Sequence, residues 1–169
     1  MTDNATDNAT DNAIDNAIDS VADNVTDEVS KQMAVTFERD PNDWLRKYSP
    51  REWLSVSLRE LAQAEAAYAG NRARTATTAC KRAAGMALNA ALVLEPKVAW
   101  GRTYIEHLAA VAHDQAVPAE VRSACRLILE ADSAAPSIVL LRTRAKDHRI
   151  VEAVRDIQAH AYAIMVRHE

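Results

Sequence analysis

The sequence predicts an all-α protein, in which a disordered acidic N-terminal tail precedes a compact antiparallel bundle of four to five helices. Three observations predict this fold class. Only 3 Gly and 5 Pro occur, and the chain is rich in Ala, Leu, Arg and Glu, which are all good helix formers. Apolar residues recur at three- and four-residue spacing, and no segment shows the alternation expected of a strand. Isolated Pro and Gly residues separate the periodic segments, as they do between helices.

The tail, residues 1–32, is built from a four-residue repeat. Asp recurs at every fourth position from Asp3 to Asp27, in units such as Thr-Asp-Asn-Ala. Asp and Asn disfavour helix interiors, and the first units have no large apolar side chain to bury, so we expect disorder. From Ile14 onward, Ile or Val enters at about every fourth position, and a frayed helix is the alternative there. Met33 suggests the hypothesis that the original chain began at that residue, which the intact mass of the native protein would test.

Charge is divided unequally between the tail and the body. Residues 1–30 hold seven Asp, one Glu and neither Lys nor Arg, a net charge of −8. The rest of the chain holds all 20 Lys and Arg and 16 of the 24 Asp and Glu, a net charge of +4. The overall charge of −4 therefore hides a mildly basic body. Such a body tolerates a polyanionic partner but does not by itself demonstrate one.

Residues 49–169 are expected to form the bundle, and residues 33–48 to connect it to the tail. The bundle opens with a strong helix start: Ser49 is a suitable N-cap, Pro50 fits the first helical position, and Glu52 completes a capping box. A Gly-Asn pair ends this helix about twenty residues later. Its apolar stripe is formed by Leu54, Leu58, Leu61, Ala64 and Tyr68.

Further helices are predicted over residues 73–94, about 102–114, from Pro118 onward, and about 148–167. The helix over 73–94 has an apolar face made largely of Ala, which lets neighbouring helices approach closely, so we place it at the bundle centre. Residues 132–147 have no clear assignment. Short loops favour antiparallel neighbours. The last helix carries its apolar stripe on Ile150, Val154, Ile157, Ala161 and Ile164.

Several classes of protein are excluded by what the sequence lacks. No stretch approaches the roughly 18 apolar residues that a membrane span needs, and the N-terminus has neither the basic start nor the apolar core of a secretory signal. We therefore expect a cytoplasmic protein without a membrane partner. Cys80 and Cys125 have no metal-ligand spacing and are expected to be buried, reduced thiols. No P-loop, dinucleotide fingerprint, metal quartet or nucleophile elbow appears, so we predict neither a metal site nor a cofactor.

Three segments carry a resemblance to a known family. Residues 53–64, WLSVSLRELAQA, are similar to an opening Trp/Leu/Ala helix, and residues 79–92, ACKRAAGMALNAAL, to an Ala-rich second helix. Residues 106–108, Glu-His-Leu, resemble a His-acid-Leu element of the third helix, with the acid and the His in reverse order. Over about residues 50–167 the chain thus resembles the HEPN domain, a helical family of higher eukaryotes and prokaryotes associated with nucleotide binding.

The resemblance implies a helical module that binds RNA or a nucleotide, or that partners a nucleotidyltransferase in a toxin–antitoxin-like arrangement. It also implies a homodimer. Some members are metal-independent ribonucleases with an Arg-x(4–6)-His motif near the start of the last helix, and Arg142 and His148 match this motif here. In such an enzyme His148 would transfer a proton at the 2′-hydroxyl or the leaving oxygen, and Arg142 would hold the phosphate. Thr143 stands where active members usually carry a residue such as Asn, so we favour a binding module over a metal-independent endoribonuclease.

Two basic groups are candidates for phosphate binding. The denser group is the run Arg142, Arg144, Lys146, His148 and Arg149, which would neutralise phosphates with strongly salt-dependent affinity. The alternative is that Asp147 caps the last helix and the basic side chains stay solvated. The second group includes Lys81 and Arg82, for which the alternative is again a solvated helix face.

A purely structural interpretation competes with the nucleotide-binding one. In it, the chain is a non-catalytic protein-interaction bundle whose Ala-rich helix and exposed apolar edge serve assembly. His107 is expected to be a surface or interface histidine, and the three Trp residues are expected to pack in the core or on helix ends. Steeply salt-dependent RNA binding would favour the first interpretation, and its absence together with a tight dimer would favour the second.

Overall fold

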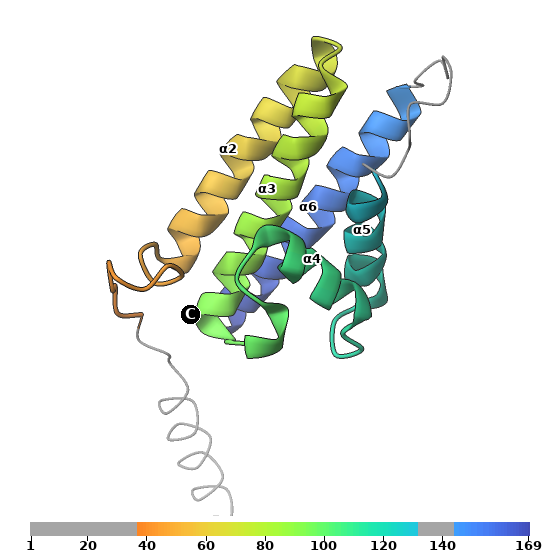
Figure 1. The fold of residues 1–169 in the computed structure, drawn as a ribbon. Coiled ribbons are helices and arrows are strands. Elements are labelled where there is room, and N and C mark those ends of the chain that lie inside the picture. Colours follow the sequence, from red (N-terminus) through yellow and green to blue (C-terminus); the bar gives the residue numbers. More distant parts are fainter. Residues whose placement is uncertain (1–36, 132–143) are drawn as a thin grey trace, which may run out of the picture. The chain divides into compact units, whose positions relative to one another are not determined.

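A computed structural model describes residues 37–131 and 144–169, with the side chains of the second range described from residue 148 onward. The acidic repeat and Met33 lie outside the described residues. Within the described ranges the chain forms α-helices and one short 3-10 helix and no strand, so the prediction of an all-α fold is confirmed (Figure 1). The elements are α2 (Pro50–Ala69), α3 (Ala73–Leu94), η1 (Val98–Trp100), α4 (Tyr104–His113), α5 (Ala119–Glu130) and α6 (Arg144–Arg167).

The start of α6 differs from the prediction. The helix begins at Arg144, four residues earlier than expected, so Asp147 lies inside its first turn and is not its N-cap. Asp147 does not define the start of the helix, because an acidic side chain interacts favourably with the free N–H groups both at the N-cap and in the first turn. Arg, Ala and Lys are also good helix formers, which favours the longer helix.

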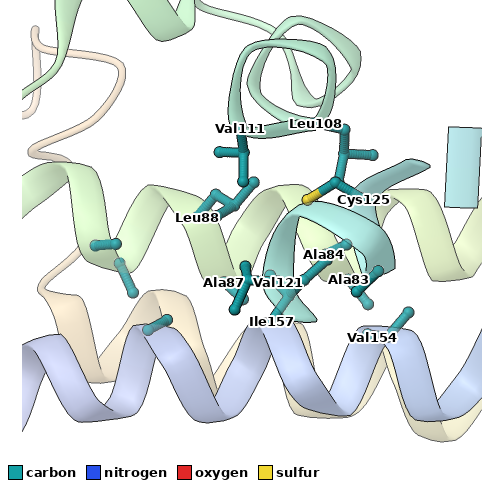
Figure 2. Close-up of a cluster of buried hydrophobic side chains, with 14 of the residues drawn as sticks. Ala83, Ala84, Ala87, Leu88, Leu108, Val111, Val121, Cys125, Val154 and Ile157 are labelled. Carbon is teal, nitrogen blue, oxygen red and sulfur yellow. The ribbon is translucent and has the colours of Figure 1, made fainter. Parts of the chain in front are cut away.

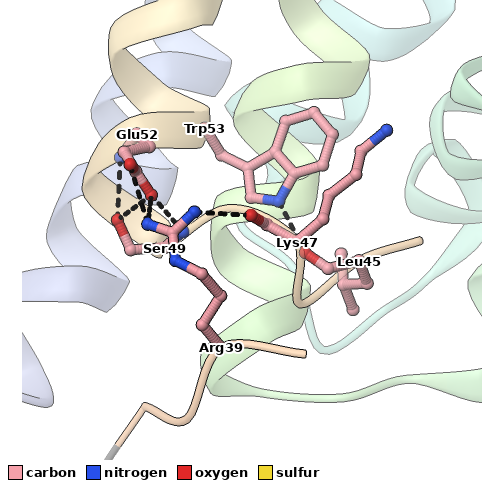
Figure 3. A network of polar contacts seen from close by, with 6 residues as sticks. All are labelled: Arg39, Leu45, Lys47, Ser49, Glu52 and Trp53. Carbon is pink, nitrogen blue, oxygen red and sulfur yellow. Dashed lines mark hydrogen bonds and ion pairs between the residues drawn. The ribbon is translucent and has the colours of Figure 1, made fainter. Parts of the chain in front are cut away.

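The start of α2 is a closed network of hydrogen bonds (Figure 3). The Ser49 hydroxyl accepts from the Glu52 backbone N–H, and the Glu52 carboxylate accepts from the Ser49 N–H at 2.8 Å, which confirms the capping box. Arg39 donates to both carboxylate oxygens of Glu52, at 2.8 and 2.7 Å. These bonds from Arg39 and Ser49 lower the pKa of Glu52 to about 2. Trp53 donates from its indole nitrogen to the Leu45 carbonyl at 2.8 Å, so the segment before α2 packs onto that helix.

The helix directions follow from contacts between their ends. α2 and α3 form a hairpin joined by a short turn (Figure 1). Arg51 near the start of α2 bonds to Glu169 at the end of the chain, and Glu65 near the end of α2 bonds to Arg155. α6 is therefore antiparallel to α2, and parallel to α3. None of the described helices is long and apolar enough to span a membrane.

α3 lies at the centre of the bundle, as its small residues predicted. It contacts α2, α4, α5 and α6, and between Ala83 and Leu94 every residue except Met86 is buried. The Ala side chains let the neighbouring helices approach closely, so larger side chains from those helices meet around α3. Figure 2 shows this cluster, with Ala83, Ala84, Ala87 and Leu88 of α3, Leu108 and Val111 of α4, Val121 and Cys125 of α5, and Val154 and Ile157 of α6.

α3 and α4 approach each other closely at Gly85. A Cβ atom at this position would overlap with the Cβ and ring atoms of Tyr104, the first residue of α4. Glycine is therefore required here by space, and its conformation is not unusual. Both predicted thiols, Cys80 and Cys125, are buried, and burial raises the pKa of Cys125 to about 12.

Two residues are placed differently from their sequence predictions. Leu58 belongs to the apolar stripe of α2, but its side chain is 53% exposed because it lies at the outer edge of the contact between α2 and α6. The sequence predicts a surface or interface position for His107, whereas its side chain is fully buried within the chain. Its Nδ1 lies 2.8 Å from the Trp100 carbonyl oxygen, and its ring stacks on Trp44 at a centroid distance of 6.0 Å. Burial lowers the pKa of His107.

Candidate functional site

The predicted basic run is only partly within the described residues. Arg142 lies outside them, and Arg144 and Lys146 lie in the first turn of α6 with side chains that are not described. His148 and Arg149 follow on the next turn, and both side chains are exposed. His148 is 78% exposed and its Nδ1 lies 3.9 Å from the Glu152 carboxylate, an ion-pair distance that is too long for a hydrogen bond. His148 and Arg149 are therefore the members of the predicted basic run whose side chains are described.

An open groove of about 430 Å³ runs between α5 and α6 beside these two residues. α5 turns its apolar face, which includes Val121, Cys125 and Ile128, toward the core. The residues of α5 that line the groove lie beside this apolar face, and the buried Ala124 belongs to both. The polar and charged lining residues are Glu120 and Ser123 of α5, and His148, Arg149, Glu152 and Asp156 of α6.

The charges of the groove are separated along α6. Glu152 and Asp156, together with Glu120 from α5, make its wall acidic. The basic residues instead gather in the first two turns of the helix, up to Arg149. Positive side chains near a helix N-terminus repel the partial positive charge of that end. Asp147 in the first turn offsets part of this charge, and a phosphate bound there would offset more of it.

The acidic wall is suited to a different part of a ligand. Carboxylate and hydroxyl oxygens such as those of Glu152 and Ser123 accept hydrogen bonds from amino groups and hydroxyls. The base and ribose of a nucleotide carry such donors, whereas its phosphate does not. The groove therefore has a basic end, whose charge suits a phosphate, and an acidic wall, whose acceptors suit a base or a sugar.

The second basic group does not join this site. The guanidinium of Arg82 donates to Glu60 of α2 at 3.0 Å, so it points toward α2 and away from the groove between α5 and α6. Lys81 is half-buried beside it on α3. These two predicted binding residues thus lie apart from His148 and Arg149.

Glu152 connects the site to the rest of the bundle. Arg155 donates to Glu152 and also to Glu65 of α2, both at 2.5 Å. Glu152 is therefore shared between Arg155 and His148. A phosphate that approaches His148 would compete with this carboxylate, and the imidazole is not held in one orientation by a short hydrogen bond. Proton transfer by His148 would need a second group to hold the phosphate, and the predicted one is Arg142.

Two buried polar side chains were not predicted as special. Both side-chain amide atoms of Asn89, and Nε2 of His107, have no hydrogen-bond partner among the described residues. Buried polar atoms normally find a partner, so these positions are unusual. The sequence signal for Asn89 is weak: it is a single polar residue inside the run Ala-Leu-Asn-Ala-Ala-Leu. Nothing among the described residues connects either side chain to the groove.

The described part of the chain gathers no group of three or more His, Cys, Asp or Glu side chains that would hold a metal ion. Comparisons with models of known protein families, with curated protein sequences and with solved structures found no match. Function is therefore inferred from the groove and its charges.

Proposed function

We propose that the bundle is a HEPN-like helical module that binds a nucleotide or single-stranded RNA. Phosphates would bind at the N-terminal end of α6, and a base or ribose would lie against the groove between α5 and α6. The observation that carries the proposal is the exposed pair His148 and Arg149 at one end of an open groove with acceptor side chains. A volume of about 430 Å³ is within the range of small-molecule sites.

The basic residues would bind the phosphate, and the acceptor residues of the groove would contact the base or the ribose. Arg149 offers a planar guanidinium that can donate two parallel hydrogen bonds to phosphate oxygens. Arg144 and Lys146 lie one turn earlier on the same helix and would add charge. Glu120, Ser123 and Asp156 would accept hydrogen bonds from the base or the ribose.

Metal-independent RNA cleavage is a possible extension of this site. His148 is exposed, and an imidazole can both accept and donate a proton. In the cleavage reaction it would take the proton of the 2′-hydroxyl or give one to the leaving oxygen while Arg142 holds the phosphate. Binding without cleavage remains the function that we favour.

Binding is tested with labelled single-stranded RNA at low salt. We expect Arg149→Ala to weaken binding about tenfold, because a hydrogen bond to a charged group contributes about 1.5 kcal/mol. The slope of log affinity against log salt should also fall by about 0.7. Arg59→Ala, on the exposed side of α2, is the matched control and should change neither quantity. Equal losses in both variants, or no binding by the wild type, would contradict the proposal.

Cleavage is tested with the same RNA in EDTA. Activity that is lost in both His148→Ala and Arg142→Ala, but kept in His113→Ala, would identify a ribonuclease at this site. His113 is an exposed histidine at the end of α4 and is therefore the control for the loss of an imidazole. Binding without any cleavage would identify a binding module.

The second candidate function is a non-catalytic protein-interaction bundle. It is favoured by exposed apolar side chains on α2 and α6, among them Leu58 and Tyr162. Several arginines of the described surface, such as Arg51 and Arg82, are also already paired with carboxylates. A nucleotidyltransferase partner, which the family resemblance implies, stays a prediction.

A further inference from the structure

α2 and α6 present the same charge pattern on their outer sides. In each helix an Arg, an apolar residue and a Glu follow one another at seven-residue spacing, so the three lie on one side of the helix. The pattern consists of Arg51, Leu58 and Glu65 in α2, and of Arg155, Tyr162 and Glu169 in α6 and its C-terminal extension.

Because the two helices are antiparallel, the patterns pair head to tail. Arg51 bonds to Glu169 at 2.6 Å at one end, and Glu65 bonds to Arg155 at 2.5 Å at the other. All four of these side chains remain substantially exposed. The six residues, which we call the α2–α6 face, therefore have an apolar centre between two exposed ion pairs of opposite orientation.

The centre of the α2–α6 face is an exposed apolar patch. Leu58 is 53% exposed, Tyr162 is 54% exposed, and the neighbouring Val166 is 50% exposed. A shallow groove of about 230 Å³ lies between the two helices here, with Leu54 and Met165 among its lining residues. Large apolar side chains that gather in one place on a surface usually mark an interaction site.

We propose that the α2–α6 face binds a second copy of this chain in a two-fold symmetric dimer. The four charged corners alternate in sign around the patch. A two-fold axis in the plane of the face brings each Arg corner onto a Glu corner of the other copy, whether the axis runs along the helices or across them. A second copy is therefore attracted at all four corners, while its Leu58 and Tyr162 cover the same residues of the first.

The same charges disfavour other occupants. An acidic partner would be repelled at Glu65 and Glu169, and a basic partner at Arg51 and Arg155, because like charges brought together in an interface cost free energy. Self-complementarity is the property that an isologous dimer requires. The α2–α6 face shares no lining residue with the groove between α5 and α6, although Arg155 of the face donates to Glu152 of the groove. The proposed dimer does not require nucleotide binding.

The first test is the mass of the full chain in solution, measured by light scattering after size exclusion. We expect about twice the monomer mass of 18.6 kDa for the wild type, and the monomer mass for Leu58→Glu at the same concentration. Ile105→Glu is the matched control, because Ile105 is a similarly exposed apolar residue (48%) on α4. It should remain a dimer. A wild type that is monomeric even near millimolar concentration would overturn the proposal, as would equal dissociation by both variants.

The second test exchanges charges at the corners. One variant carries Arg51→Glu and Arg155→Glu, so all four of its corners are acidic, and the other carries Glu65→Arg and Glu169→Arg, so all four are basic. Each should be a monomer alone, and mixing the two should restore the dimer mass. Exposed ion pairs contribute little to folding, so both variants should keep the wild-type circular dichroism spectrum. If each variant alone still forms the dimer, the α2–α6 face is not the interface.

Discussion

α3 and α6 are parallel neighbours of similar length, but they stabilise the bundle in different ways. α3 is covered by four other helices and is buried on all sides over its second half. Described residues of α6 are buried on one side only, and the other side carries ion pairs to α2 and to the end of α3. A helix of the first kind is constrained by space, because any added atom meets a neighbour. A helix like α6 is constrained by space on one side only, and the charged side chains on its outer side can also contact a binding partner.

This difference predicts that substitutions in α3 lower the stability of the protein more than substitutions on the outer sides of α2 and α6. Paired substitutions, one interior and one exposed, test this difference. Each one compares an interior position with a matched position where the same chemical change meets solvent or open space.

The largest effect is expected for Gly85→Ala. In an unconstrained helix interior this change would stabilise by about 1 kcal/mol, because Ala has the higher helix propensity. Here the added methyl would overlap with Tyr104, including its Cβ, which no side-chain rotation can move. α4 must shift away from α3, and overpacking of this kind costs about 3 kcal/mol. Chemical denaturation should show a net loss of about 2 kcal/mol in the free energy of unfolding.

Gly70→Ala is the control for Gly85→Ala. Gly70 lies at the end of α2, where an added Cβ would make ordinary contacts and the backbone has a negative φ. This variant should be neutral or slightly stabilising, by about 0.5 kcal/mol. If Gly85→Ala is as stable as Gly70→Ala, Tyr104 of α4 does not pack tightly against α3 at Gly85.

An intermediate effect is expected for Ser57→Ala, where α2, α3 and α6 meet. The buried Ser57 hydroxyl donates to the Ala83 carbonyl at 2.7 Å and accepts from the Gln158 side chain at 2.8 Å. Its removal leaves the Gln158 amide buried without this acceptor, which costs about 1.5 kcal/mol. Ser55→Ala, two residues away on the exposed side of α2, should be neutral in the same denaturation experiment. Equal free energies of unfolding for the two variants would show that the two hydrogen bonds of the buried Ser57 hydroxyl contribute nothing to stability.

The fold was predictable where the signal is local. Ser49 and Glu52 form their capping box within four residues, and the small residues of α3 indicate a central helix without knowledge of its neighbours. Leu58 lies on the apolar stripe that the sequence predicts, but its exposure depends on where α6 lies across α2, which is a long-range property. The start of α6 was placed too late because Asp147 suits both a cap and a first turn.

The candidate site was less predictable than the fold. The sequence predicts His148 and Arg149 as binding residues from their place in a basic run, but the acidic residues that line the same groove come partly from α5. The sequence places Arg82 among the binding residues and does not predict its ion pair with Glu60 of α2. The spacing of residues along the chain predicts which charged residues share a helix face. It does not predict which residue each of them pairs with, because that depends on how the helices pack.

The smallest effect is expected from the titration of His107. Burial lowers the pKa of His107 in the folded protein, against 6.5 for an ordinary histidine. Its Nδ1 faces the Trp100 carbonyl and Glu106 lies beside it in α4, but burial has the larger influence. Above pH 6.5 the ring is neutral in both states, and its contribution to stability is complete. As the pH falls below that value, the unfolded chain binds a proton first, so stability decreases until the pH reaches the lowered pKa.

The measurement is the free energy of unfolding from about pH 7.5 to about pH 5.5, a window above the titration of most carboxylates. His107→Gln removes the titrating group and should flatten the pH dependence, whatever its effect on absolute stability. His113→Gln, at an exposed position of the same helix, should keep the wild-type slope. Burial also lowers the pKa of His160, so part of the slope should remain in both variants. Identical slopes for His107→Gln and the wild type would mean that His107 is not held neutral in the interior against the Trp100 carbonyl.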